Sequence, residues 1–189
     1  MIVPAEKQDA REVIALMFEA IGSEIARNLT GTDDDGEAIA ALEELYREEG
    51  NRVSYQNCIV DKRDGKVAGM LLCYSGDEAA ELDKPLLRRI REETGRENPH
   101  IQTEAEKGDY YLDSLAVGSG YRGQGIATEL IAEFERRTGD KGYSRASLIV
   151  EPDNAGAYAL YSRLGYRESG ELRVAGKTFL RMTKEITSS

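Results

Sequence analysis

The chain has 189 residues, of which 40% are hydrophobic and 32% charged, as expected for one globular domain that buries a core without metal or disulfide staples. Its net charge of −10 argues against a nucleic-acid partner, because a phosphate backbone needs a basic surface. The sequence lacks an apolar run long enough to span a membrane and a signal-peptide pattern, which predicts a cytoplasmic protein without a membrane partner.

The first quarter of the chain predicts a short strand and two helices. The strand is expected at 2–4. Asp9 then caps a helix whose apolar residues recur at helical spacing, in a pattern that can continue to Leu29. After an aspartate-rich turn at 32–36, a second amphipathic helix ends at Gly50-Asn51.

A β-hairpin is expected next, with strands at 54–61 and 66–75 and a turn in the four residues between them. With that turn, Cys58 faces Gly69, and Cys73 lies beyond disulfide reach. We therefore expect two buried free thiols, which are typical of a reducing compartment.

A charged segment with few apolar residues occupies 76–109 and forms an insertion in the predicted domain. Asp83 and Pro85 can begin a short helix within it, and the rest is expected to be loop. A connection of this length inside a compact domain is usually functional or mobile.

The second half of the chain alternates strands and helices. A strand at 110–117 leads through a glycine-rich turn into an amphipathic helix, and a strand follows at 144–150. A further helix ends at Gly165, and a hairpin at 166–183 turns near Ala175-Gly176. The order β-α-α-β-β-(insertion)-β-α-β-α-β-β predicts a mixed α/β sheet with one βαβ unit in its second half.

The glycine-rich turn is Gly118-Ser119-Gly120-Tyr121-Arg122-Gly123. Such a turn, placed between a strand and a helix N-terminus, presents backbone amides to a phosphate group. The turn matches the G-x-G-x-x-G pattern of dinucleotide sites, but the acid that ends the next strand, Glu151, lies too far along to bind the ribose. The chain after Gly123 is also too short for a doubly wound sheet, and a P-loop pattern is missing from the sequence.

An overlapping pattern in the same turn fits better. It is Arg122-x-x-Gly125-x-Ala127, which resembles motif A of the GNAT superfamily of N-acetyltransferases, R/Q-x-x-G-x-G/A. A second block that looks like the family's is Asn154-x-x-Ala157-x-x-Leu160-Tyr161-x-x-Leu164-Gly165-Tyr166. The resemblance covers 110–166. It implies one GNAT-like α/β domain over 1–189, with a mostly antiparallel twisted sheet flanked by helices, and an acetyl-CoA-dependent N-acetyltransferase.

The resemblance also implies where acetyl-CoA binds. Its pyrophosphate is expected on backbone amides at the start of the helix, those of Arg122, Gly123, Gln124, Gly125, Ile126, Ala127 and Thr128. Its pantetheine arm is expected to pair with the strand edge formed by Leu115, Ala116 and Val117, and the amide near Val117 to polarise the thioester carbonyl. Asn154 is expected to contact the pantetheine or to serve only as a helix N-cap.

Tyr161 occupies the position of the family's general acid, which protonates the thiolate of CoA. A phenol suits this task because it keeps its proton at neutral pH. Tyr161 also lies on the apolar stripe of its helix, so an ordinary core tyrosine is the alternative interpretation.

The general base is predicted from the residues alone. Asp113 is the first candidate, and a structural or solvent-facing aspartate is the alternative. Strand alternation places it on one face with Tyr111, Leu115 and Val117. Glu151 is the second candidate, and His100, the only histidine, is better interpreted as a solvated loop residue.

One histidine and two separated cysteines match no metal-ligand spacing, so we expect no metal. In the family the acceptor side is lined by regions that correspond to 21–51 and 76–109 here, and both are acid-rich. These acidic residues are compatible with a small cationic amine or a peptide amine as acceptor. The alternative interpretation is an acidic surface that only faces solvent. A homodimer is left open. The alternative functions are a non-catalytic acyl-CoA-binding or regulatory module on the same fold and, less favoured, a dinucleotide-dependent oxidoreductase.

Overall fold

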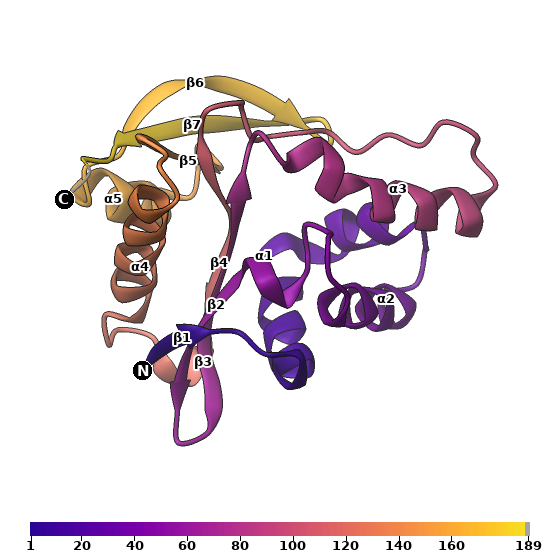
Figure 1. Ribbon diagram of the computed structural model, residues 1–189, viewed down its shortest axis with the longest axis horizontal. Coiled ribbons are helices and arrows are strands. Elements are labelled where there is room, and N and C mark those ends of the chain that lie inside the picture. Colours follow the sequence, from indigo (N-terminus) through magenta and orange to yellow (C-terminus); the bar gives the residue numbers. More distant parts are fainter. Residues whose placement is uncertain (188–189) are drawn as a thin grey trace.

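Seven strands form one sheet in the order β1-β2-β3-β4-β5-β7-β6 in the computed structural model, which describes residues 1–187 (Figure 1). Their bounds are β1 Ile2–Pro4, β2 Cys58–Arg63, β3 Lys66–Ser75, β4 Tyr110–Val117, β5 Arg145–Val150, β6 Arg167–Val174 and β7 Lys177–Glu185. All neighbouring strands pair antiparallel except β4 and β5. The predicted fold class, a mostly antiparallel sheet flanked by helices, is confirmed.

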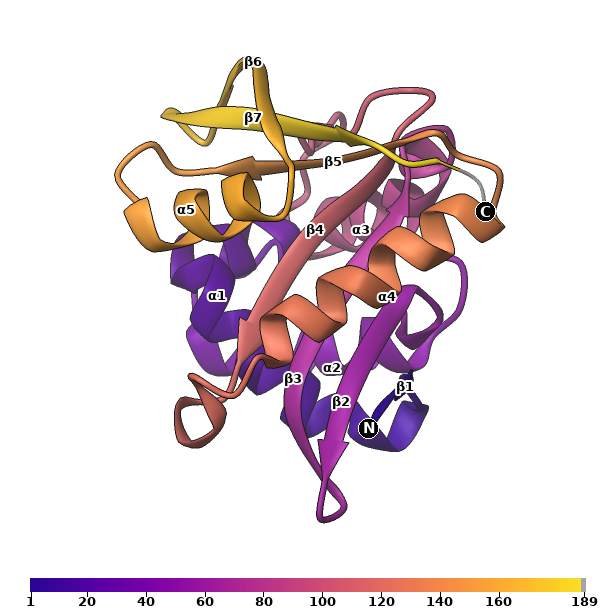
Figure 2. The same ribbon diagram turned by 90° about the vertical axis from the view of Figure 1, so that its left-hand side faces the viewer.

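Helices cover both faces of this sheet (Figures 1 and 2). One face carries α1 Ala10–Thr30, α2 Asp35–Arg47 and α3 Ala79–Thr94, and the other carries α4 Ile126–Asp140 and α5 Ala155–Arg163. The short 3-10 helices are η1 Lys7–Asp9, η2 Tyr55–Asn57 and η3 Ser119–Tyr121. Each face has its own apolar core, one built around Ile14, Leu42 and Met70 and the other around Leu71, Leu130 and Phe134.

Helix α1 is bent at Gly22, whose φ of 82° and ψ of 165° are not helical. Glycine adopts this conformation at little steric cost, whereas an L side chain would strain it. The helix resumes beyond the bend and ends at Gly31 in the left-handed conformation. The bend gives the two halves of α1 different directions along the sheet.

The β2–β3 hairpin differs from the prediction in its register. Its turn is the two-residue Asp64-Gly65, with φ values of 50° and 76°, and a bulge follows Asp61. Cys58 therefore pairs with Leu72 and not with Gly69. Cys58 and Cys73 are one position apart in register, but their side chains enter cores on opposite faces of the sheet. Both thiols are free and buried, as predicted.

The charged segment holds more helix than expected. Helix α3 begins at Ala79, and Pro85, which was expected in its first turn, lies inside it. Its buried residues recur at helical spacing and are Ala79, Asp83, Leu86 and Ile90. The prediction of a short helix from Asp83 is wrong. It takes Pro85 as the mark of a first turn, and the few apolar residues before Pro85 give only a weak helix signal.

Strands β4 and β5 pair only at Tyr110 with Ala146 and at Tyr111 with Ser147. Beyond these two positions the strands diverge, as Figure 2 shows. The edge of β4 from Leu112 onward therefore faces a gap in the middle of the sheet, and its peptide groups on that side are without a strand partner.

Candidate active site

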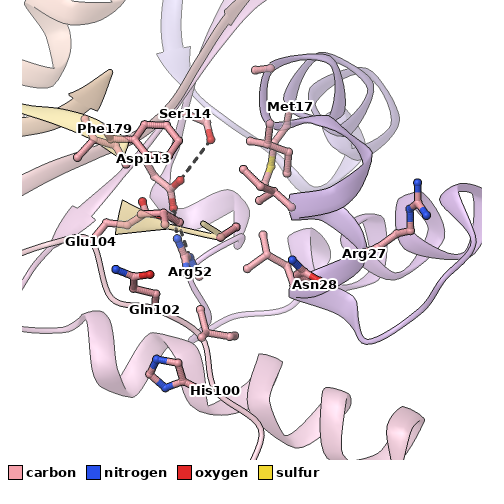
Figure 3. Close-up of a pocket in the computed structure, with 18 of the residues that line it drawn as sticks. Met17, Arg27, Asn28, Arg52, His100, Gln102, Glu104, Asp113, Ser114 and Phe179 are labelled. Carbon is pink, nitrogen blue, oxygen red and sulfur yellow. Dashed lines mark hydrogen bonds and ion pairs between the residues drawn. The ribbon is translucent and has the colours of Figure 1, made fainter. Parts of the chain in front are cut away.

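A cavity of about 830 Å³ occupies the gap between β4 and β5 and continues beside α1 (Figure 3). Its walls come from both halves of the bent α1, from α3, from the loop at 95–109, from the start of α5 and from the β6–β7 hairpin. The cavity therefore joins the open edge of β4 to the region where the charged segment lies.

A β-bulge in β4 shapes the floor of this cavity. Leu72 pairs with Ser114, whereas the next residue, Cys73, pairs with Leu112, so Asp113 is an extra residue in β4. The bulge interrupts side-chain alternation: Leu115 and Val117 pack in the α4 core, and Asp113 points to the α1 face. The prediction that Asp113 shares a face with Leu115 and Val117 is therefore wrong.

Asp113 is the acceptor in a dense set of hydrogen bonds. Its Oδ2 lies 2.8 Å from Nη2 and 3.3 Å from Nε of Arg52, and 2.7 Å from the hydroxyl of Tyr74. Ser114 Oγ donates to Oδ1 at 3.3 Å. The Arg52 guanidinium is buried and also contacts Asp83 at 3.4 Å. Asp113 and Asp83 thus share one guanidinium between β4 and α3.

A second carboxylate, that of Glu104, enters the cavity from the loop at 95–109. Its Oε2 accepts a hydrogen bond from the Tyr111 hydroxyl at 2.6 Å. Burial raises the pKa of Glu104 above its usual value, the negative charge of Asp113 raises it further, and Arg52 opposes both effects. The sequence places Glu104 only among the acids of the segment 76–109, because loop spacing carries no signal of which acidic side chain turns inward.

The glycine turn has the backbone that a phosphate group requires. Gly123 and Gly125 have φ values of 75° and 79°, and a side chain placed at either would point into open space. Gly125 is the N-cap of α4, and its carbonyl accepts the Glu129 amide at 3.0 Å. The amides of the first turn, those of Ile126, Ala127 and Thr128, precede this bond and project from the positive end of the helix. This arrangement fits a pyrophosphate.

Arg122 is exposed beside these amides, and its Nε donates to the carbonyl of Val117 at 3.4 Å. The side chain thus bridges the end of β4 and the turn. Gln124 is also exposed in the turn. Leu115, Ala116 and Val117 lie along the unpaired edge of β4, and the turn that starts at Gly118 follows them directly, so the structure brings both predicted parts of the cofactor site together.

Tyr161 lies on α5 at the wall of the cavity and is 8% exposed. Burial raises the pKa of Tyr161 to about 12, so its hydroxyl keeps its proton throughout the physiological range. Its ring packs edge-on against Tyr166, with 5.9 Å between the centroids. Asn154 also lines the cavity, and its side chain caps α5 by accepting the Ala157 amide at 3.2 Å.

The remaining candidates from the sequence also border the cavity. Glu151 follows β5 directly, and His100 lies in the loop at 95–109; both side chains are exposed. Within residues 1–187, histidine, cysteine and acidic side chains do not gather in a group of three or more suited to a metal ion. None of the helices in this part of the chain has the length and apolar character needed to cross a membrane.

Comparison with known sequences connects the site to a family. The model of the Acetyltransferase (GNAT) family matches residues 24–166. The chain is 32% identical over 111 residues to N-alpha-acetyltransferase MAK3 of Arabidopsis thaliana, a match that covers 59% of this chain and 45% of that protein. It is 32% identical over 71 residues to acetyltransferase SG1711 of Sodalis glossinidius, covering 38% of this chain and 48% of that protein. The chain thus spans less than half the length of these relatives.

Solved structures match the fold over nearly the whole chain. A crystal structure of an acetyltransferase superposes with a TM-score of 0.81 at 25% identity, covering 99% of this chain and all of that one. An N-acetyltransferase from Staphylococcus aureus Mu50 has a TM-score of 0.80 at 22% identity, covering 97% of this chain and all of that one. With the family model matching most of the chain and the glycine turn, diverging strands and α5 in place, this chain belongs to the GNAT family of acetyltransferases.

Proposed function

We propose that this chain transfers the acetyl group of acetyl-CoA to the nitrogen of a primary amine. The observation that carries the proposal is the early divergence of β4 and β5 next to the glycine turn that opens α4. This geometry offers peptide groups for an extended amide-bearing chain and helix-terminal amides for a pyrophosphate. The two features lie next to each other, as the adjoining pantetheine and pyrophosphate groups of one CoA molecule require.

Several residues of this chain would hold the cofactor. The amides of Arg122 to Thr128 bind the pyrophosphate, and the open edge of β4 at Leu115, Ala116 and Val117 pairs with the pantetheine arm. Asn154 adds a side-chain contact from the start of α5. When bound, acetyl-CoA supplies an acetyl group activated as a thioester.

Tyr161 is proposed as the general acid. As the amine nitrogen forms its bond to the acetyl carbon, the carbon–sulfur bond breaks and the leaving sulfur takes the phenolic proton. The raised pKa of Tyr161, about 12, supports a group that holds its proton until a thiolate develops beside it. An amide near Val117 would polarise the thioester carbonyl.

The sequence-predicted bases, Asp113 and Glu151, stay predictions. The contacts of Asp113 with Arg52 and Tyr74 also support a second role, that of an anion that fixes Arg52 beneath the cavity. Carboxylates on the cavity wall favour a cationic acceptor, either a small amine or the amine of a peptide.

Titration calorimetry with acetyl-CoA, CoA and NAD, followed by CoA release measured over polyamines, aminoglycosides, amino acids and peptides, tests the proposal. We expect micromolar binding of acetyl-CoA and release of CoA with at least one amine class. Binding of acetyl-CoA without CoA release would favour the non-catalytic module. Binding of NAD in place of CoA would favour an oxidoreductase, which the mostly antiparallel sheet argues against.

The expected location in the cytoplasm and the absence of nucleic-acid and membrane partners stay predictions from the sequence. A homodimer is equally untested, and light scattering of the purified protein measures it directly.

A further inference from the structure

Glu104 is held on the cavity wall by two elements of the sheet. From β4, the Tyr111 hydroxyl donates to its Oε2 at 2.6 Å. From β7, Arg181 Nη1 donates to its backbone carbonyl at 3.3 Å. Side chain and main chain are thus fixed from different strands, which orients the carboxylate more firmly than one contact does.

The loop that carries Glu104 is tied down at its end. The buried carboxylate of Asp109 accepts hydrogen bonds from Arg145 of β5 and Arg181 of β7. Gly76 donates its amide to the Asp109 carbonyl at 2.9 Å, and a side chain at Gly76 would collide with the backbone of Glu106. The end of the loop that leads into β4 is therefore held in place by contacts with other elements. Glu104 does not lie on a solvated loop.

The carboxylates of Asp113 and Glu104 differ in how many of their oxygen atoms are free to accept a further hydrogen bond or a proton. Asp113 Oδ2 already accepts from Arg52 and Tyr74, and its charge is balanced by the guanidinium. Glu104 accepts from Tyr111 through Oε2, and its Oε1 has no hydrogen-bond partner among residues 1–187. Glu104 is therefore the better placed of the two to receive a proton.

We propose that Glu104 accepts the proton that the acceptor amine loses during acetyl transfer. This role rests on the proposed function. The amine nitrogen forms a bond to the acetyl carbon and the carbon–sulfur bond breaks. The nitrogen's proton passes to Glu104 Oε1, directly or through one water, and the sulfur takes the proton of Tyr161.

The electrostatic surroundings of Glu104 support this role. Burial and then the charge of Asp113 raise its pKa above the usual value of a glutamate, which strengthens it as a proton acceptor. The titratable and charged groups around Glu104 come from β3, α3, β4, β7 and the segment before η2. They are Tyr74, Asp83, Tyr111, Asp113, Arg181 and Arg52. Below the pKa of Glu104 the carboxyl is protonated and cannot accept, so kcat/KM should fall as the pH is lowered through that value.

The test compares Glu104→Gln with the control Glu97→Gln, an exposed glutamate of the same loop. Glutamine keeps the acceptor for Tyr111 but cannot take a proton. We expect E104Q to lower kcat by about 100-fold or more and to remove the acidic limb of the kcat/KM profile. Its Kd for acetyl-CoA and its thermal midpoint should match the wild type, and E97Q should behave as wild type throughout.

Two results would overturn the role. The first is a wild-type kcat and pH profile in E104Q. The second is loss of the acidic limb in Asp113→Asn while E104Q retains it, which would make Asp113 the base. Failure of the wild type to bind acetyl-CoA, or to release CoA with any amine of the panel, would overturn the proposed function itself. The acetyl-CoA titration on the wild type separates these cases.

Discussion

Arg52 and Asp113 form a largely buried ion pair between the segment before η2 and the bulge of β4, with Nη2 2.8 Å from Oδ2. The exposed fractions of the two side chains are 6% and 11%. The same guanidinium lies over the ring of Tyr74, 5.7 Å from its centroid, and contacts Asp83 of α3. One buried cation thus joins α3 to the middle of the sheet.

Removing this cation is expected to destabilise the fold strongly. Arg52→Met leaves the carboxylates of Asp113 and Asp83 buried without a counter-charge, a loss of about 3–5 kcal/mol. Urea unfolding followed by circular dichroism measures it. Lys84→Met, which breaks an exposed pair with Glu81, is the control and should cost less than about 1 kcal/mol. Equal losses in the two variants would contradict the expectation.

Tyr161→Phe should reduce turnover without weakening cofactor binding. The change removes the proton donor and keeps the ring that packs against Tyr166. We expect kcat to fall by about 100-fold, within the usual range for loss of a general acid, and the Kd for acetyl-CoA to stay constant. Stopped-flow release of CoA and calorimetry measure the two quantities. An unchanged kcat would remove Tyr161 from the mechanism and leave it a core residue.

Gly125→Ala should weaken binding of acetyl-CoA. An L residue at φ 79° carries about 1–2 kcal/mol of strain, and relief of that strain would turn the first amides of α4 away from the phosphate position. A Kd increase of about tenfold corresponds to 1.4 kcal/mol.

Gly142→Ala is the matched control for this variant. Gly142 has a φ of 81° and equally open surroundings, but it lies beyond the opposite end of α4. It should lose stability and bind acetyl-CoA as the wild type does. Equal effects of both variants on Kd would mean that the glycine turn has no special part in binding.

Tyr111→Phe should move the acidic limb of the kcat/KM profile to higher pH. The Tyr111 hydroxyl stabilises the charged form of Glu104, so its removal raises the pKa of that carboxyl further. A pH series with the best amine of the panel measures the shift. If Tyr111 were purely structural, its loss would lower activity equally at every pH. That outcome would show that Tyr111 does not affect the titration of Glu104.

The two thiols should be unreactive in the folded protein. Burial raises the pKa of Cys73 to about 12 and that of Cys58 higher still, so neither forms appreciable thiolate at neutral pH. Titration with a disulfide reagent should detect no fast-reacting thiol before denaturant is added and two afterwards. Rapid reaction in the native state would show that the hairpin opens.

Elements whose sequence signal is local were predictable. The stripe of α4, the cap of α5 at Asn154 and the Ala175-Gly176 turn each depend on neighbours within a few residues, and the structure confirms all three. The sequence predicts a four-residue turn where the structure has the two-residue turn Asp64-Gly65. The predicted register of the β2–β3 hairpin is therefore wrong. Local patterns identify an element more reliably than its pairing partners.

The part of the cavity around Arg52, Asp113 and Glu104 depends on contacts between distant residues. Arg52 and Asp113 are 61 positions apart, and nothing near Arg52 in the sequence marks it as buried. The bulge at Asp113 appears in the pairing of β4 with β3. The alternation of residues along β4 alone does not predict it. Glu104 is oriented by Tyr111 of β4 and Arg181 of β7, and Arg181 is far from it in the sequence. Tertiary packing therefore decides which acidic side chains turn inward.

The divergence of β4 from β5 has a consequence for sequence variation. A ligand that pairs with the open edge of β4 touches main-chain atoms, and the side chains of Leu115 and Val117 turn into the α4 core. Substitutions that keep those residues apolar and extended leave the edge unchanged. The shape of this edge therefore depends on strand geometry more than on which apolar residues occupy it, and the fold itself is shared at a TM-score of 0.80 with a chain of 22% identity.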